Sequence, residues 1–189
     1  MPGYQSTLVE AQIDGTAVTA TGEGSLLPTV AKIFLPSGYI NRIGKRFIVR
    51  ATGRVSNIVT TPGTLTLRFK LGPTANIAVA ACTPIPLNVV AKTNVSWFLD
   101  LGLTVRTIGT ATAATIFAQG NWTSESVIAS PTAATGGQGS MMWQTASPVV
   151  GTGFDSGVAN QIDLTAQFSL TGNSIQLHTF ALEDLTTTP

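Results

Sequence analysis

The longest regular feature of the sequence is an alternation of apolar and polar residues in VSWFLDLGLTVRT, residues 95–107. Side chains two apart in a strand point to the same face, so this period of two predicts a β-strand with one buried face. The same alternation recurs over residues 46–55, 64–71, 161–170 and 174–185, while helical periodicity is almost absent. The chain is therefore expected to be all-β.

About eight strands of medium length are expected, separated by turns rich in Gly and Pro, with no internal repeat and no convincing helix. This pattern favours an antiparallel β-sandwich, and we expect a jelly-roll-like arrangement. The apolar positions predict a core that contains Phe47, Val49, Leu65, Leu67, Phe69, Trp97, Leu99, Leu101, Leu164 and Phe168.

Residues 26–189 are expected to form one sandwich domain, preceded by an extended N-terminal arm over residues 1–25. The arm is rich in Gly and Thr and has few apolar residues to pack. Such an arm could be disordered, or it could bind a neighbouring subunit by adding a strand to it.

Two local predictions concern neighbouring strands. The turn TTPG, residues 60–63, predicts that strands 46–55 and 64–71 pair as a hairpin. In residues 115–124, Phe117 and Trp122 are of opposite parity with Gly120 between them, which predicts a bulge.

Charge is distributed unevenly along the chain, although its net value is only +1. All ten Lys and Arg residues fall within residues 32–106, and half of them within residues 42–54, whereas residues 1–31 and 107–189 carry acids and no base. Such a distribution predicts an oriented electric field, which bears on association with partners. If the predicted hairpin forms, five outward cations share one sheet face: Arg46, Arg50, Arg54, Arg68 and Lys70.

Three interpretations of this basic face remain open. The first is a solvated surface, the second is a docking face for an acidic protein, and the third is a nucleic-acid site. Nucleic acid is the least favoured because the positions between the cations are Ile48, Thr52, Thr64 and Thr66, with no stacking aromatic. We therefore expect a protein interface with no nucleic-acid partner.

Catalysis is not expected. His178 is the only histidine, and no Ser or Cys motif of a nucleophilic enzyme accompanies it. Asp155 and Asp163 could form an acid pair or bind calcium, but two acids eight residues apart are a weak signal. The single cysteine, Cys82, lies in an apolar stretch and is expected to be buried and inert. No cofactor and no metal are expected.

The chain also contains no apolar run of about 18–20 residues that would span a membrane. Its first fifteen residues lack the basic start and apolar core of a secretion signal. No membrane association is therefore expected.

Several stretches together resemble a known group of proteins: FLPSGYINRIGKRFIVRATGRVSNIVTTPGTLTLRFKLG, NVSWFLDLGLTVRTIG, IFAQGNWTSE and GTGFDSGVANQIDLTAQFSLTGNSIQLHTFALEDL. Over roughly residues 30–185 the chain resembles small β-rich structural proteins of tailed bacteriophages. The resemblance implies a virion protein of jelly-roll type, of the kind that decorates and stabilises the outer surface of the head (a cement protein). It also implies a homotrimer whose partner is the major capsid protein. No catalytic residue is carried over.

Two other classes stay open. A tail- or fibre-associated sandwich that binds host carbohydrate or a receptor needs exposed aromatic residues, for which Tyr39, Trp122 and Trp143 are candidates while Trp97 is expected in the core. A sandwich hydrolase needs paired acids on facing strands.

Overall fold

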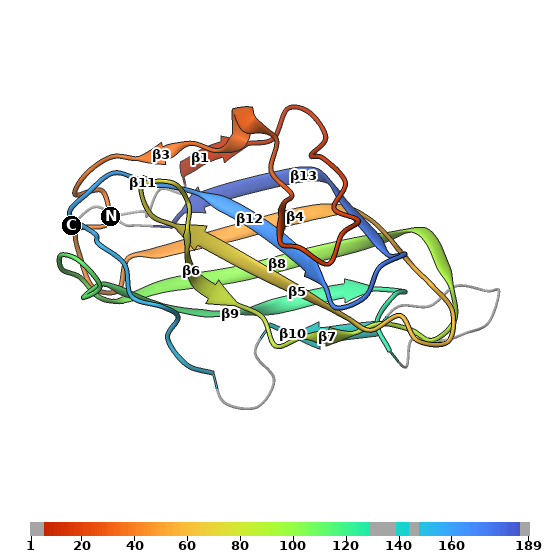
Figure 1. Cartoon of the computed structure of the whole chain (residues 1–189). Helices are drawn as coiled ribbons and strands as arrows, with labels where there is room; N and C mark the ends of the chain where they lie inside the picture. The colour runs from red at the N-terminus through yellow and green to blue at the C-terminus, as the bar shows by residue number, and fades with distance from the viewer. Residues whose placement is uncertain (1–5, 129–138, 144–147, 186–189) are drawn as a thin grey trace.

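A computed structural model describes residues 6–128, 139–143 and 148–185 of the chain. Two antiparallel sheets pack face to face (Figure 1). The six-stranded sheet has the order β1 (Ser6–Glu10), β13 (Ser174–Asp184), β4 (Arg46–Asn57), β8 (Lys92–Thr107), β9 (Thr115–Ser124) and β10 (Gly139–Met142). The predicted antiparallel β-sandwich is confirmed.

The five-stranded sheet has the order β2 (Gly24–Ser25), β12 (Asp163–Phe168), β5 (Thr64–Leu71) and β6 (Ile77–Ala81), with β7 (Ile85–Pro86) also paired to β5. A small two-stranded sheet joins β3 (Phe34–Leu35) to β11 (Asn160–Gln161), and one 3-10 turn, η1, spans Thr29–Ala31. Early strands pair with late ones in both sheets, β4 with β13 and β5 with β12.

The core lies between the two sheets, where the alternating sequence pattern predicts it. All ten predicted core residues are buried, each at most 3% exposed. Burial along β4 alternates without interruption from Arg46, exposed, to Asn57, buried. The core prediction is confirmed because a period of two fixes which face of a strand is apolar.

The predicted hairpin of residues 46–71 is wrong. Strand β4 pairs with β13 and β8, and β5 pairs with β12, β6 and β7 in the other sheet. Residues 58–63 carry the chain from one sheet to the other, and Asn173 holds this crossing by accepting from the Ile58 amide and donating to the Pro62 carbonyl. Two strands with one apolar face each can bury those faces side by side or across a sandwich, and the pattern is the same in both cases.

The prediction that the N-terminal arm has little to pack against is also wrong over residues 6–25. Strand β1 pairs with the edge of β13, and the amides of Ala11, Gly15 and Val18 continue along it by donating to β13 carbonyls at 2.8–3.0 Å. The segment then crosses to the other sheet, where β2 pairs with β12. Residues 6–25 therefore join the two sheets along one side of the sandwich.

A second segment closes the opposite side. Val150 forms a β-bridge to Phe117 within β9, and Phe154 forms one to Ala114, next to β9. The amide of Thr152 donates to the carbonyl of Ala78 in β6. Residues 150–154 thus connect the edge of the six-stranded sheet to the edge of the five-stranded sheet. Covering these edges leaves fewer free backbone groups for unwanted strand pairing.

The bulge predicted near Gly120 is absent. The β8–β9 register runs unbroken from Trp97–Ser124 to Val105–Ile116. Phe117 therefore points outward, with the Arg106 guanidinium 4.9 Å from its ring centroid, while Trp122 points into the core. The cation–π contact with Arg106 stabilises Phe117 on the outer face, so no change of register is needed to bury its ring.

The junction of β13, β4 and β8 depends on one tryptophan and one glycine. The indole nitrogen of Trp97 donates to the carbonyls of Arg54 and Gln176, both at 3.2 Å. Gly53 lies opposite Trp97 in the β4–β8 register, and a Cβ there would lie 1.9 Å from the Gln176 oxygen and 2.8 Å from the indole nitrogen.

We expect Gly53→Ala to lower the free energy of unfolding by about 3 kcal/mol or more, because backbone must move to admit the methyl group. Gly102→Ala, in β8 of the same sheet, is the control, since its Cβ would meet nothing closer than 3.5 Å. Urea unfolding of both variants checks this. Equal loss in the two variants would contradict the role assigned to Gly53.

Candidate functional site

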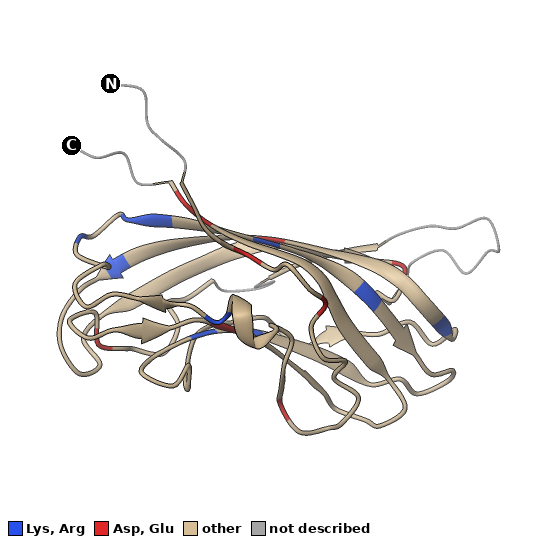
Figure 2. Ribbon diagram, turned by 90° about the horizontal axis from the view of Figure 1, so that it is seen from above, with Lys and Arg blue, Asp and Glu red and all other residues tan. Residues whose placement is uncertain are grey.

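The five predicted interface cations lie on two different faces of the molecule. Arg46, Arg50 and Arg54 are on β4 and face outward from the six-stranded sheet, whereas Arg68 and Lys70 are on β5 in the other sheet. Figure 2 shows basic residues on both layers. The single basic face does not form, because β4 and β5 are not neighbours.

Most of these cations have partners within the chain. The Arg50 Nη1 atom donates to both carboxylate oxygens of Glu183, at 3.1 and 3.0 Å, and Arg54 donates twice to the Gln176 side-chain oxygen. In the other sheet, Arg68 and Lys70 both pair with Glu23, at 3.7 and 3.2 Å. Cations engaged in this way have less charge to offer an acidic partner.

Charges that are far apart in the sequence are thus neighbours in space. Lys32 pairs with Asp163 at 3.1 Å, and buried Lys45 pairs with Asp184 at the same distance. Tyr39 completes the second pair: its hydroxyl donates to Asp184, and the Lys45 ammonium lies 3.7 Å from its ring centroid. These contacts fasten the terminal segments to the middle of the chain.

Glu23 shows how one such pair depends on charge. Burial alone would raise the pKa of this carboxyl, but a hydrogen bond from Thr165 and the nearby Lys70 and Arg68 cations outweigh it. The pKa of Glu23 therefore lies below its usual value of 4.5. The charged form is favoured in the folded protein.

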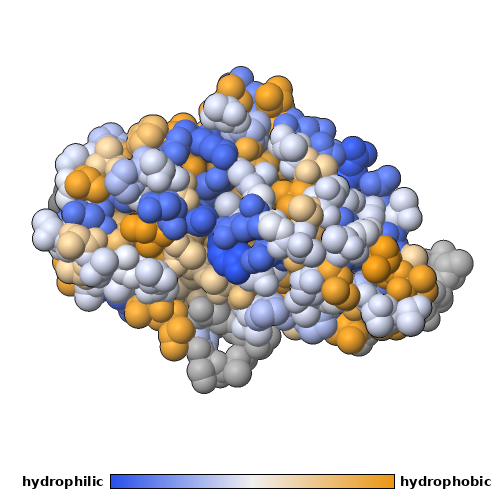
Figure 3. Space-filling model, viewed as in Figure 1, coloured by the Kyte–Doolittle hydropathy of each residue, from blue (hydrophilic) through white to orange (hydrophobic). Residues whose placement is uncertain are grey.

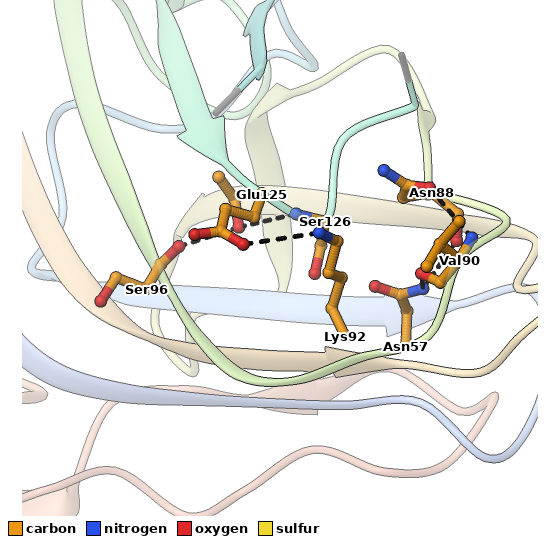
Figure 4. A network of polar contacts seen from close by, with 8 residues as sticks. Asn57, Asn88, Val90, Lys92, Ser96, Glu125 and Ser126 are labelled. Atoms are coloured by element: carbon orange, nitrogen blue, oxygen red, sulfur yellow. Dashed lines mark hydrogen bonds and ion pairs between the residues drawn. The ribbon is translucent and has the colours of Figure 1, made fainter. Parts of the chain in front are cut away.

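A further polar network closes one end of the sandwich (Figure 4). The Asn57 amide donates to the carbonyls of Asn88 and Val90, at 2.6 and 3.0 Å, and Lys92 pairs with Glu125 at 3.5 Å. The side-chain oxygens of Asn57 and Ser126 are buried without a hydrogen-bond partner. The network fixes the loops that follow β4 and β9.

Two adjoining hollows lie on the outer face of the six-stranded sheet. We call the first the aromatic hollow. It has a volume of about 360 Å³ and is centred on Phe98, whose side chain is exposed. We call the second the arginine hollow; it has a volume of about 570 Å³ and is lined at one end by Arg46 and Arg106. Asp100 and Asn121 line both hollows, which therefore adjoin each other.

Polar side chains border Phe98 in a fixed arrangement. Thr52 and Thr123 lie opposite Phe98 in the neighbouring strands. Asn121 donates to Thr123 at 3.2 Å and accepts from Ser140 at 2.6 Å. The aromatic hollow thus presents one exposed ring beside hydroxyl and amide groups that are already oriented.

The aromatic residues selected from the sequence are not the exposed ones. Trp122 and Trp143 are buried, 0% and 1% exposed, so their prediction as binding residues is wrong; Trp97 is in the core as predicted. Tyr39 is half-buried and engaged with Asp184 and Lys45. Phe98 and Phe117 were missed, although their parity, opposite to that of Trp97 and Trp122, already assigns them to the outer face.

The other candidate residues have local structural contacts. Asp155 accepts from the amides of Ala111 and Gly157 at 2.8 Å, while Asp163 is buried against Lys32, so the two acids do not form a pair. His178, at a bulge of β13, lies 2.9 Å from Asp14. Among the described residues, no group of three His, Cys, Asp or Glu side chains could hold a metal ion.

Cys82 is buried, as predicted, and accepts a hydrogen bond from the Leu67 amide at 3.0 Å. Burial raises the pKa of its thiol to about 11. The thiolate is the reactive form, so the folded protein holds very little of it at neutral pH.

No helix in the part of the chain that the structure describes is long and apolar enough to cross a membrane.

Comparison with known proteins gave one structural likeness. No family model matches the chain, and no curated protein matches it. Among solved structures, the chain is similar to the CBM2 module of the evolved Dit of phage J-1 of Lactobacillus casei BL23, with a TM-score of 0.36, 9% identity and 100% of both chains covered. A likeness this distant adds nothing to the strand pairings and the site geometry, on which the functional conclusion depends.

We expect Glu23→Gln to lower the free energy of unfolding at pH 7, where the charged carboxylate stabilises the fold. Because the folded pKa lies below the unfolded one, this stabilisation is present above about pH 4.5 and is lost as the pH falls through the folded value. Urea unfolding from pH 7 to pH 3 should show the two proteins converging. Glu10→Gln is the control, since Glu10 forms no ion pair among the described residues; a constant difference between wild type and Glu23→Gln at all pH values would contradict the assignment.

We expect the Cys82 thiol to resist a disulfide reagent at pH 8 in the folded protein and to react within minutes in denaturant. Absorbance of the released thiolate measures both rates. Rapid reaction without denaturant would show that Cys82, which directly follows β6, is accessible to solvent and would contradict the prediction.

Proposed function

We propose that this chain is a non-enzymatic attachment protein of a tailed-bacteriophage particle, placed at the tail or a fibre, that binds host-surface carbohydrate. The observation that carries the proposal is the pair of adjoining hollows on the outer face of the six-stranded sheet, with exposed Phe98 among oriented polar groups. The sequence resemblance supports the phage particle as the setting.

The chemistry of the aromatic hollow suits a sugar. A pyranose ring has an apolar C–H face, which packs on an aromatic ring, and hydroxyl groups around its rim, which need both donors and acceptors. Asn121 and Thr123, which line the aromatic hollow together with Phe98, supply both kinds of group, and Ser140 hydrogen-bonds to both of them. Binding sites commonly combine an apolar contact surface with a few fixed polar groups in this way.

The hollows also favour binding over hydrolysis. Cleavage of a glycosidic bond generally uses two carboxyl groups about 5–10 Å apart. Among the described residues that line the two hollows, Asp100 is the only carboxylate. A site with one carboxylate can hold a sugar without cleaving it.

A glycan array probed with the labelled protein tests the proposal. We expect binding to a defined set of glycans, and we expect Phe98→Ala to weaken it about tenfold through loss of the ring contact. Phe34→Ala is a matched control, because Phe34 is equally exposed, 53% against 55%, and lies outside both hollows. A blank array, or equal loss in both variants, would refute carbohydrate binding at this face.

Head decoration is a second candidate, supported by an apolar end of the sandwich. Val59, Val89 and Leu170 are exposed there, and backbone bonds such as Thr60 to Val89 hold the loops together. Apolar side chains gather at this end of the face seen in Figure 3. Exposed apolar patches often mark protein interfaces, so this end could contact the major capsid protein or another subunit of a homotrimer.

Copy number in purified particles separates the two candidates. A tail or fibre protein is expected in a handful of copies, and a decoration protein on the outer surface of the head in hundreds. Quantitative mass spectrometry of whole particles measures this ratio against the major capsid protein. Light scattering adds the oligomeric state, for which the decoration candidate requires a trimer.

A further inference from the structure

The arginine hollow contains two cations that the fold leaves without an acidic partner. Among the described residues, no carboxylate lies within ion-pair distance of Arg46 or Arg106, whereas Arg50 on the same face pairs with Glu183 and Asp100. Both side chains are exposed, and both line the same hollow. The chain therefore maintains two uncompensated positive charges at one place on a surface with few charges.

The sheet register places the two arginines close to each other on the same outward face. Arg46 lies opposite Thr104 in the β4–β8 pair, so Arg106, two residues further along β8, is its diagonal neighbour on the same face. Phe117 lies opposite Thr104 from the other side, and the Arg106 guanidinium stacks over its ring at 4.9 Å. This stacking restrains Arg106, and the absence of a side chain at Gly102 leaves room for the Arg46 guanidinium, one nitrogen of which would lie 3.6 Å from a Cβ there.

We propose that the arginine hollow binds the acidic groups of an anionic glycan, with Arg46 and Arg106 as the residues that recognise its carboxylates or phosphates. The proposal rests on the proposed function and specifies the substrate class. Guanidinium groups bind carboxylate and phosphate through paired hydrogen bonds, and two of them without internal partners suit a ligand that carries repeated negative charge. The distance along β8 from Phe98 to Arg106 is about 27 Å at 3.4 Å per residue, which suits an extended polymer across both hollows.

A nucleic acid is the other polyanion that could bind two arginines. The ring of Phe117 is covered by Arg106, which leaves Phe98 as the one exposed aromatic among the described residues of the two hollows. Binding to single strands generally uses several stacking rings along a basic groove. The net charge of +1 also provides little electrostatic attraction for a phosphate backbone.

Binding to three soluble polymers tests the inference: polygalacturonate, its fully methyl-esterified form and poly(glycerol phosphate). The first two share a backbone and differ in charge, and the third carries phosphate in place of carboxylate. We expect the wild-type protein to bind at least one anionic polymer about tenfold or more tightly than the ester, because hydrogen bonds to charged groups are worth about twice neutral ones. The anionic polymer that binds more tightly shows whether the site prefers carboxylate or phosphate.

Three single substitutions locate the effect. Arg46→Gln and Arg106→Gln should each weaken binding of the anionic polymer about tenfold. Arg54→Gln removes the same charge from the same face of the sheet but lies outside both hollows, and it should change binding less than about twofold. Equal weakening by all three variants would show that binding depends only on the net charge of the protein, which would overturn the inference.

The remaining outcomes separate the inference from the proposed function. If array glycans bind, Phe98→Ala weakens them and the arginine variants do not, the carbohydrate site stands and the anionic specificity is wrong. If the wild-type protein binds neither anionic polymer better than the ester, the inference fails, whereas the proposed function fails with a blank array or with equal loss in Phe98→Ala and Phe34→Ala. Tighter binding to a single-stranded oligonucleotide than to either anionic polymer would also overturn it.

Discussion

The fold depends on the pairing of β4 with β13 on one side and β8 on the other. The β4–β13 pair joins strands that are more than a hundred residues apart, and the junction places Trp97 where its indole bonds carbonyls of both β4 and β13. Gly53 makes the contact possible because no side chain occupies the space. Every other strand of the six-stranded sheet is added outward from these three, so the positions of Phe98, Arg46 and Arg106 on the outer face follow from them.

Opposite charges hold the ends of the chain to this centre. Acids from the N-terminal and C-terminal thirds pair with bases from the middle, as in Glu23 with Lys70, Asp163 with Lys32 and Asp184 with Lys45. Exposed pairs of this kind contribute little each, but buried ones are costly to leave incomplete, so they favour one arrangement of the termini. The segregation of charge along the sequence thus serves folding first, whereas Arg46 and Arg106 have no acidic partner among the described residues and Arg54 bonds the neutral Gln176.

The candidate site lies on a sheet face, where side chains are held by strands on both sides. Phe98 and Arg106 belong to the longest strand, β8, and their neighbours Asn121 and Phe117 to β9, which pairs with β8 in unbroken register from Trp97 to Val105 and shifts its register at Arg106. A site built on paired strands is already ordered before a ligand arrives, so little conformational entropy is lost on binding. The ligands that the site can bind are determined by its outward-facing side chains, which alternate with the core residues along each strand.

The sequence by itself determined the long strands, the faces they bury and the ten core residues, because a period of two is a local property of the chain. The alternation also places Arg46, Phe98 and Arg106 at outward positions, whereas the predicted bulge near Gly120, which is wrong, would have turned Phe117 to the face of Trp122. Which strands pair was decided only by the tertiary structure, since β4 and β5 have the same apolar pattern whether they are neighbours or face each other across the core. That choice separated the five predicted cations, attached residues 6–25 to the sandwich and gathered Phe98, Asn121, Arg46 and Arg106 on one face. Long-range pairing is fixed by the packing of the whole chain, and no local pattern encodes it.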